Sequence, residues 1–388
     1  MRYVHCLNNI SKKGTDTLPD NYELTDDINQ ADGIMVRSAA MHDMEFSDNL
    51  LAIARAGAGV NNIPLDRCAE EGIVVFNTPG ANANAVKEIV IAGLLLASRD
   101  IIGGIEWCKE NADDENIAKT REKAKKAFAG NELKGKKLGV IGLGAIGALV
   151  SNAAIALGMD VYGYDPFLSV NAAWRIDNAV THVTDVSDIY KNADYITIHV
   201  PATADTKGMI NADAIAQMKD GVNFLNFARD TLVDNDAMAA GLESGRVAHY
   251  VTDFAVPAAM KMKNAIVLPH LGASTEEAED NCAIMAAKEL TDYIENGIIV
   301  NSVNYPVNNM GGIRAGIARV CVLHKNVPAI LSKITAILGD ANVNIANMAN
   351  NGKGDNAYTL IDVEADVDDA AVEKIGAIEG VRRVRVIK

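Results

Sequence analysis

The chain has 388 residues, 49% hydrophobic and 22% charged, a length that allows two or three domains with separate cores. Its formal net charge of −15 argues against a nucleic-acid or acidic-membrane surface as the main partner. No apolar run reaches the ~20 residues of a membrane-spanning helix, and the N-terminus lacks the apolar core of a signal peptide. We therefore expect a cytoplasmic globular protein without a membrane partner.

The five cysteines are scattered, without a CxxC pair or a cluster of cysteines and histidines. Metal sites and disulfide frameworks place these residues at short, regular spacings. We therefore expect reduced thiols and no metal.

Strand-like apolar runs alternate with helical patterns in the first part of the chain. The runs end at Gly, Pro or Ser and lie at 33–39, 50–59 and 72–80. Such alternation is typical of a parallel sheet. An apolar helical pattern then covers 85–107, and a charged stretch that we expect to be helical and solvated covers 109–137.

The clearest unit begins with a buried strand at 136–142, which is followed by a helix at 145–158 and a second strand at 159–165. Further strand–helix pairs continue to about residue 270. A long helix is expected from Ser274 to Gly297, because Ser274 and Glu277 have the spacing of a capping box.

The turn VIGLGAIG between the first strand and its helix has the pattern GxGxxG. Gly142 permits a tight turn, Gly144 lets the backbone approach a pyrophosphate, and Gly147 lets helix and strand pack closely. The N–H groups at the helix start, at Ala145 and Ile146, are placed to hold phosphates. This context predicts a dinucleotide-binding unit.

Asp165 ends the second strand, 23 residues after Gly142. A carboxylate at this point accepts hydrogen bonds from the adenosine ribose hydroxyls and repels a 2′-phosphate. The segment YDPFLS offers no Arg or Lys to neutralise such a phosphate. The sequence therefore favours NAD over NADP.

Two charged or titratable residues follow later strands of this unit. Arg229 comes after the apolar run VNFLNFA, and His270 comes after AIVLP. A nicotinamide enzyme that acts on an alcohol needs a group to exchange the hydroxyl proton and a cation to hold the substrate. Each residue alone could be an exposed charge or a core histidine, but their presence in one nucleotide-binding unit favours catalysis.

Six motifs together resemble the D-isomer-specific 2-hydroxyacid dehydrogenase family. They are MVRSA (35–39), RAGAGVNNI (55–63), NTPGANANAVKE (77–88), GNELKGKKLGVIGLGAIG (130–147), NFARDTLVD (226–234) and PHLGASTEEAEDN (269–281). The motifs stand in the family order and, with the C-terminal segment, cover essentially the whole chain.

The resemblance implies an α/β fold with two lobes, each a doubly wound Rossmann-type parallel sheet. The C-terminal segment has the order strand, helix, strand, strand, helix, strand, which predicts a ferredoxin-like βαββαβ domain, and it resembles an ACT domain. The expected domains are a discontinuous substrate-binding lobe at 1–90 and 285–305, an NAD-binding lobe at 91–284, a linker at 306–316 and an ACT regulatory domain at 317–388.

The resemblance also implies roles for individual residues. His270 would exchange the proton of the substrate hydroxyl, Arg229 would bind the substrate carboxylate and carbonyl oxygen, and Asp253 would hold the nicotinamide carboxamide. Further cofactor contacts are expected at Thr78, Pro201, Phe227, His270, Gly272 and Ala273. Further substrate contacts are expected at Arg37 and Ser38, which would meet a phosphate, and at Arg55, Gly57, Ala58, Gly59 and Asn82.

The sequence departs from the family where a catalytic glutamate is expected five residues after Asp253. Ala258 stands there, and 254–269 contains no acidic residue. The imidazole of His270 would then form a hydrogen bond with water, with a backbone carbonyl, or with another acid such as Glu276 or Glu277.

A second departure is Asp230, where the family usually has Gly. Its carboxylate could orient Arg229 or compete with an anionic substrate for it.

The segment HKNVPAILSKITAILGDANVNIANM (324–348) carries the resemblance to an ACT domain. The positions that match effector contacts are His324, Asn326 and Asn344, and the effector implied by the resemblance is L-serine.

The resemblance, Arg37 and the ACT segment favour NAD-dependent oxidation of 3-phospho-D-glycerate to 3-phosphooxypyruvate, the first step of L-serine biosynthesis, by a homodimer or homotetramer. One alternative is a dehydrogenase of another 2-hydroxy acid. Another is a non-catalytic NAD-sensing regulatory protein, which Ala258 favours and the intact Arg229 and His270 oppose.

Overall fold

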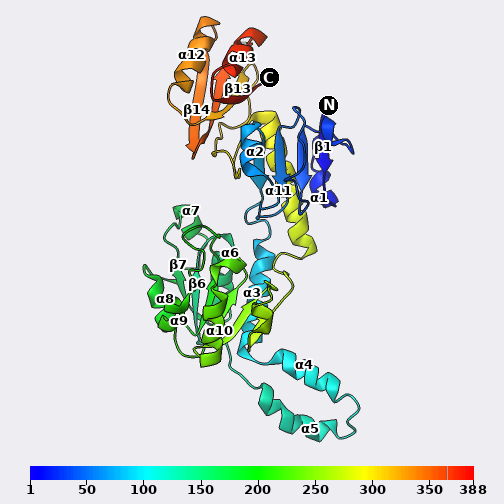
Figure 1. Cartoon of the computed structure of the whole chain (residues 1–388), viewed down its shortest axis with the longest axis vertical. Coiled ribbons are helices and arrows are strands. Elements are labelled where there is room, and N and C mark those ends of the chain that lie inside the picture. The colour runs from blue at the N-terminus through cyan, green and yellow to red at the C-terminus, as the bar shows by residue number, and fades with distance from the viewer. Residues whose placement is uncertain (365) are drawn as a thin grey trace. The chain divides into compact units, whose positions relative to one another are not determined.

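The structure is a computed structural model that describes residues 1–364 and 366–388, and these residues form three β-sheets (Figure 1). The chain divides into two compact units, Met1–Asn82 with Glu276–Lys388 and Ala83–Thr275. Within the described ranges, no helix is long and apolar enough to cross a membrane.

The N-terminal part of the first unit is a five-stranded parallel sheet in the order β2-β1-β3-β4-β5. Its strands are β1 (Arg2–Cys6), β2 (Tyr22–Leu24), β3 (Gly33–Val36), β4 (Ala52–Arg55) and β5 (Val74–Asn77). Short helices connect them: α1 (Lys12–Thr15), η1 (Ile28–Gln30) and α2 (Leu65–Glu70). Strand β3 is buried at all four residues, as expected of a parallel strand covered on both faces.

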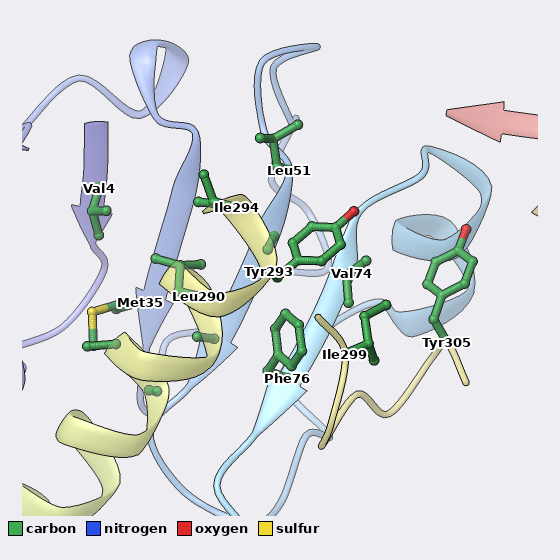
Figure 2. Close-up of a cluster of buried hydrophobic side chains, with 14 of the residues drawn as sticks. Val4, Met35, Leu51, Val74, Phe76, Leu290, Tyr293, Ile294, Ile299 and Tyr305 are labelled. Carbon is green, nitrogen blue, oxygen red and sulfur yellow. The ribbon is translucent and has the colours of Figure 1, made fainter. Parts of the chain in front are cut away.

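Helix α11 (Glu276–Asn296) packs on this sheet (Figure 2). Its buried face includes Leu290, Tyr293 and Ile294, which meet side chains of the strands such as Met35 and Phe76. The helix ends before Gly297, whose φ of 69° is the left-handed conformation that closes helices. The long helix expected up to Gly297 is therefore confirmed at its end, but it begins at Glu276, and the hydroxyl of Ser274 donates to the carbonyl of His270 at 3.3 Å.

The second unit contains seven parallel strands in the order β12-β11-β10-β9-β6-β7-β8. They are β6 (Lys137–Ile141), β7 (Asp160–Tyr164), β8 (Thr181–His182), β9 (Tyr195–Ile198), β10 (Val222–Asn226), β11 (Val247–Thr252) and β12 (Ala265–Val267). The strand order reverses beside β6, and in open sheets of this kind ligands bind at the carboxyl ends of the strands at such a reversal. The predicted Rossmann-type sheet is confirmed.

Helices flank and extend this sheet. They are α3 (Ala83–Ser98), α4 (Ile101–Glu110), α5 (Ile117–Ala124), η2 (Lys125–Phe128), α6 (Ala145–Ala156), α7 (Val170–Ala173), α8 (Val186–Asn192), α9 (Ala212–Gln217), η3 (Asp230–Leu232), α10 (Asn235–Ser244) and η4 (Ala259–Lys261). The apolar pattern at 85–107 is not one helix, because Asp100 accepts the N–H of Gly103 and begins α4 as its N-cap.

The C-terminal segment forms an antiparallel sheet in the order β14-β15-β13-β16. Its elements are β13 (Ala318–Lys325), α12 (Ile330–Asp340), β14 (Ile345–Lys353), β15 (Asn356–Val363), α13 (Asp369–Gly376) and β16 (Val381–Ile387). The predicted βαββαβ order is confirmed; of the predicted domain, Ala365 alone lies outside the described residues.

This C-terminal sheet binds the last carbonyl groups of α11 and the residue after it. Arg385 donates to the carbonyl of Tyr293 at 2.9 Å, and the Tyr358 hydroxyl donates to the carbonyl of Gly297 at 2.8 Å. Arg319 donates to the carbonyl of Asn296 at 2.9 Å and is paired with a buried aspartate, Asp362, through two hydrogen bonds. The last carbonyl groups of a helix have no hydrogen-bond donors within the helix. The side chains of Arg385, Tyr358 and Arg319 supply donors at this end of α11.

The unit boundaries fall at 82/83 and 275/276. The boundaries expected from the sequence, 90/91 and 284/285, lie inside α3 and α11. The structure keeps each of these helices whole, α3 in the second unit and α11 in the first.

Candidate active site

The glycine-rich turn joins β6 to α6, as the sequence predicts. Gly142 has φ of 92°, and a Cβ atom there would lie 2.6 Å from the carbonyl oxygen of His199. A Cβ on Gly147 would lie 1.9 Å from the carbonyl oxygen of Gly142, so helix and turn touch at this point. No heavy atom lies within 4 Å of the position that a Cβ on Gly144 would take. The turn therefore leaves room for a phosphate in front of Ala145 and Ile146 at the start of α6.

Asp165 follows β7 and braces this turn. One carboxylate oxygen accepts the N–H of Leu143 at 2.9 Å, and the other accepts the N–H of Phe167 at 2.9 Å. A cavity of about 780 Å³ opens beside it, with Trp174 and His182 among its lining residues. Each carboxylate oxygen retains a lone pair, so the carboxylate can still accept from ribose hydroxyls.

His199 follows β9, two residues before Pro201, and the sequence reasoning did not single it out. Its Nε2 lies 3.0 Å from the hydroxyl of Thr197, and its Nδ1 is buried without a partner in the described structure. Burial lowers the pKa of His199 to about 3, so its imidazole is neutral at physiological pH. His199 is thus a neutral imidazole beside the glycine-rich turn, with one ring nitrogen hydrogen-bonded and the other without a partner in the described structure.

Asp253 follows β11 and is 1% exposed. Its Oδ2 accepts the N–H of Gly272 at 2.8 Å, whereas its Oδ1 is buried and has no partner in the part of the chain that the structure describes. Burial raises the pKa of Asp253, and the charges of His270 and Arg229 oppose this rise. A buried acceptor without a donor fits the amide group of a nicotinamide, which donates two hydrogens.

His270 follows β12 in a left-handed backbone conformation, with φ of 54°. Its N–H donates to the carbonyl of Asp253 at 2.8 Å, and its ring lies against Phe254 with the ring centroids 5.5 Å apart. Within residues 83–275, no carboxylate forms a hydrogen bond with the imidazole. Ala258 is exposed before η4, and the ring contact of His270 within this range is with Phe254.

Arg229 follows β10 and is exposed. Its Nη1 donates to the carbonyl of Ala228 at 2.6 Å, and its own carbonyl accepts from Asn226 at 2.9 Å. Asp230 accepts the N–H of Thr231 at 2.9 Å and forms no ion pair with Arg229 among the described residues. The carboxylate of Asp230 therefore neither orients nor occupies the arginine in this conformation.

Phe227 and Ala273 complete the edge of this sheet. The Phe227 side chain is 5% exposed and faces Gly93 of α3, so only its backbone is available to a ligand. Ala273 is half-buried in the loop after His270, next to Gly272. Because β10, β11 and β12 are neighbours, Arg229, Asp253 and His270 meet at one edge.

In the first unit, the expected substrate residues also lie at the carboxyl ends of parallel strands. Arg37 and Ser38 follow β3, and the side-chain oxygen of Asn8 accepts their N–H groups, both at 2.9 Å, together with that of Ala39 at 3.1 Å. Arg55 ends β4 and donates from Nε to the carbonyl of Arg37 at 3.1 Å. Asn8 was missed from sequence because its partners lie about thirty residues away.

The loop after β4 is held close to the residues that follow β5. Gly57 has φ of 144°, and Asn77 donates to the carbonyl of Ala58 at 2.7 Å, one residue before Gly59. Thr78 follows β5 with a fully buried hydroxyl that has no hydrogen-bond partner in the described structure. Thr78 was expected to contact the cofactor. Asn82, which was expected to bind substrate, is half-buried and ends this part of the unit.

Arg37 already has an anionic partner in the first unit. Its Nη2 lies 2.6 Å from the carboxylate of Glu279 in the first turn of α11. Sequence reasoning did not foresee this pair, because 242 positions separate the two residues.

The effector candidates fall into two places in the C-terminal sheet. His324 and Asn326 line a cavity of about 500 Å³ with Asn350, and His324 is 3% exposed. Asn344 is not among the residues that line this cavity; it donates to Glu364 at 2.9 Å.

Comparisons with known proteins agree with this geometry. The family model described as D-isomer specific 2-hydroxyacid dehydrogenase, NAD binding domain, matches residues 91–272. The chain is 33% identical to the D-3-phosphoglycerate dehydrogenase of Escherichia coli K12, over 95% of this chain and 90% of that protein. The chain belongs to the D-isomer-specific 2-hydroxyacid dehydrogenase family.

Other members of the family support the same placement. The D-3-phosphoglycerate dehydrogenase of Haemophilus influenzae is 33% identical over 89% of this chain and 83% of its own length. The solved structure of NAD⁺-bound 3-phosphoglycerate dehydrogenase from Entamoeba histolytica has a TM-score of 0.62 and 25% identity, covering 78% of this chain and 98% of that chain. The chain is therefore a dehydrogenase of this family, homologous to 3-phosphoglycerate dehydrogenases.

Proposed function

We propose that the chain oxidises 3-phospho-D-glycerate to 3-phosphooxypyruvate with NAD, the first step of L-serine biosynthesis. The observation that carries the proposal is the common edge of β10, β11 and β12, which holds Arg229, Asp253 and His270. The 33% identity to 3-phosphoglycerate dehydrogenases over most of the chain supports the choice of substrate.

NAD, when bound, accepts the hydride from C2 of the substrate. Gly144 leaves open space where its pyrophosphate would lie, while Gly142 and Gly147 allow the turn and α6 to pack closely. The unpaired Oδ1 of Asp253 would accept from its carboxamide. Asp165 supports NAD over NADP, because a second negative charge beside this carboxylate would be repelled.

Arg229 and His270 act on the reacting end of the substrate. The guanidinium of Arg229 binds the substrate carboxylate and the oxygen at C2, which fixes C2 relative to the cofactor. A ring nitrogen of His270 takes the hydroxyl proton during oxidation and returns it during reduction.

Arg37 and Ser38 are the proposed ligands of the substrate phosphate, with Arg55 beside them. A guanidinium donates two parallel hydrogen bonds to a phosphate, which suits Arg37 to this role. The backbone of Gly57, Ala58 and Gly59 is the proposed ligand of the substrate carboxylate, with Asn82 as a further substrate contact. Thr78 is the proposed cofactor contact in this unit.

The test is steady-state turnover of 3-phospho-D-glycerate, D-glycerate and other 2-hydroxy acids with NAD and with NADP. We expect 3-phospho-D-glycerate with NAD to have the highest kcat/KM. His270→Ala should lower kcat about 10²–10⁴-fold, because the proton acceptor is lost. His42→Ala, which alters an exposed histidine of the first unit, should leave kcat unchanged. A higher kcat/KM for another hydroxy acid would contradict the choice of substrate.

Ala258, in place of the family glutamate, motivates one alternative: a non-catalytic NAD-sensing protein that would have lost the activity of its family. This candidate predicts tight NAD binding without turnover of any hydroxy acid, even after the Ala258→Glu substitution restores the family acid. Turnover by the unaltered chain that is lost in His270→Ala would exclude it.

We further propose that the C-terminal domain is an ACT domain that binds L-serine. The cavity lined by His324 and Asn326 supports this, because its polar groups suit an amino acid. Inhibition of turnover by L-serine, weakened in Asn326→Ala, is the expected result.

A homodimer or homotetramer is the proposed assembly. Helix α4 exposes Ile101, Ile102 and Ile105 by 40%, 39% and 51%, and such apolar side chains are suited to contact with a second copy. Light scattering should give at least twice the monomer mass of 41.2 kDa.

A further inference from the structure

The arginine proposed for the substrate phosphate is engaged by a carboxylate of its own chain. Arg37 Nη2 lies 2.6 Å from Glu279 Oε1, and both side chains are 43% exposed. The pair is thus reachable from solvent, and an incoming anion can exchange with Glu279.

Glu279 is held in place by the residue that follows it. Asp280 accepts from the Ser11 hydroxyl at 2.5 Å and from Lys13 at 2.5 Å, and its side chain is only 12% exposed. These contacts tie the first turn of α11 to α1, so the position of the Glu279 carboxylate does not depend on Arg37 alone.

The backbone around Arg37 offers little else to an anion. The side-chain oxygen of Asn8 accepts the N–H groups of Arg37, Ser38 and Ala39, which would otherwise form an anion-binding nest. Arg55 uses its Nε on the carbonyl of Arg37. A phosphate at this loop must therefore be bound by side chains. The guanidinium of Arg37 is the side-chain group proposed for this, and it forms an ion pair with Glu279.

We propose that Glu279 sets the specificity of the site for phosphorylated substrates by competing with the phosphate for Arg37. The inference rests on the proposed function, which assigns the phosphate to Arg37. Glu279 acts through Arg37 and does not touch the reacting atoms, so it should alter substrate affinity and leave the chemical step unchanged. Substitution of Glu279 should not change the affinity for a hydroxy acid that has no phosphate.

The size of the effect follows from the exposure of the pair. Exposed ion pairs are weak and screened by salt, but removal of Glu279 also removes repulsion of a doubly charged phosphate. We expect Glu279→Gln to lower KM for 3-phospho-D-glycerate about two- to tenfold at low ionic strength. This decrease in KM should become smaller as the ionic strength rises.

The experiment compares Glu279→Gln with Glu70→Gln, which removes the same charge from an exposed position at the end of α2. The kinetic constants kcat and KM are measured for 3-phospho-D-glycerate and for D-glycerate at low and high ionic strength. The expected result is a lower KM for the phosphorylated substrate alone, with kcat within about twofold and no change in the control. An unchanged or higher KM in Glu279→Gln would overturn the proposal, because Glu279 would then be neutral or would position Arg37 for binding.

A binding measurement separates this inference from the proposed function. Calorimetric titration of 3-phospho-D-glycerate into NADH-saturated protein involves no turnover. Tighter binding by Glu279→Gln without turnover by the unaltered chain would reject the proposed reaction and keep the competition. Turnover with equal binding by both proteins would reject the competition and keep the reaction.

Discussion

Glu289 lies in the buried face of α11 with only one of its carboxylate oxygens bonded. Oε1 accepts from Asn301 at 2.5 Å, while Oε2 is buried without a partner in the described structure. Burial raises the pKa of Glu289 from 4.5 to about 7. The folded protein therefore binds an additional proton between these two pH values, and the stability that this proton contributes is lost as the pH rises through about 7.

Glu289→Gln should consequently stabilise the protein at pH 8 and have little effect at pH 5. A neutral amide removes the cost of a buried charge, which a shift from 4.5 to about 7 places at about 3 kcal/mol at pH 8. Urea unfolding of both proteins at the two pH values measures this. Glu70→Gln on the surface should show no such pH dependence, and an equal effect at both pH values would refute the ionisation of Glu289.

At the same residue scale, sequence reasoning identified the groups that belong to local motifs and missed those defined by tertiary contacts. The glycines at 142, 144 and 147 follow a spacing that the backbone itself requires. Asn8 and Glu279 act on Arg37 from distant positions, and no local pattern contains that information.

The glycines of the β6–α6 turn constrain its geometry in different ways. A Cβ on Gly147 would lie 1.9 Å from the carbonyl of Gly142, whereas a Cβ on Gly144 would meet no heavy atom within 4 Å. Gly144 also has φ of −69°, which any residue adopts. The two glycines therefore serve different purposes, one in packing and one in ligand approach.

Alanine at each position should separate these purposes. Gly147→Ala should destabilise the second unit by about 2–4 kcal/mol, because α6 must move away from the turn. Gly144→Ala should keep the unfolding temperature and weaken NADH binding at least about tenfold, because its methyl group lies where the pyrophosphate approaches. Calorimetric unfolding and fluorescence titration measure the two effects. Normal NADH affinity in Gly144→Ala would place the pyrophosphate elsewhere.

The elements themselves were predictable where periodicity and capping agree, as for β6 and α6. The expected helix at 85–107 was wrong because a single capping residue, Asp100, starts a new helix within an unbroken apolar pattern. Apolar periodicity indicates which face of a helix is buried, and it does not indicate where one helix ends and the next begins.

At the scale of the whole molecule, the C-terminal domain and α11 stabilise each other. The ring of Tyr293 of α11 contacts two other rings in tilted geometry: that of Phe76, with the centroids 5.8 Å apart, and that of Tyr358 of the C-terminal sheet, with the centroids 6.3 Å apart. The guanidinium of Arg385 lies 4.4 Å from the centre of the Tyr293 ring. Together with the carbonyl bonds of Arg319 and Tyr358, these contacts form one continuous core within the first unit.

A chain ending at residue 316 should therefore lose stability in the part that remains. Removal of the C-terminal sheet exposes Tyr293 and leaves three carbonyls at the end of α11 without their donors. We expect the unfolding temperature of the first unit to fall by at least about 5 °C, with the second unit unchanged. Calorimetry of the full and shortened chains measures both transitions. Identical transitions would show that the two parts fold independently.

Fold class was predictable at this scale because it depends on element order, which the sequence displays. The attachment of the C-terminal sheet to α11 was not predictable, because Arg319, Tyr358 and Arg385 are spread over three strands and converge only after folding.

Helix α11 is a single rod of 21 residues and thus about 30 Å long. Glu279 lies in the first turn of the helix. Arg385 of the C-terminal sheet donates a hydrogen bond to the carbonyl of Tyr293 in its last turn. A rod of this kind behaves as a lever: a tilt of a few degrees imposed at one end displaces the other by an ångström or more, which is comparable to the length over which a hydrogen bond is made or lost. One element, α11, therefore connects the C-terminal sheet to the carboxylate that pairs with Arg37, without a chain of intervening side chains.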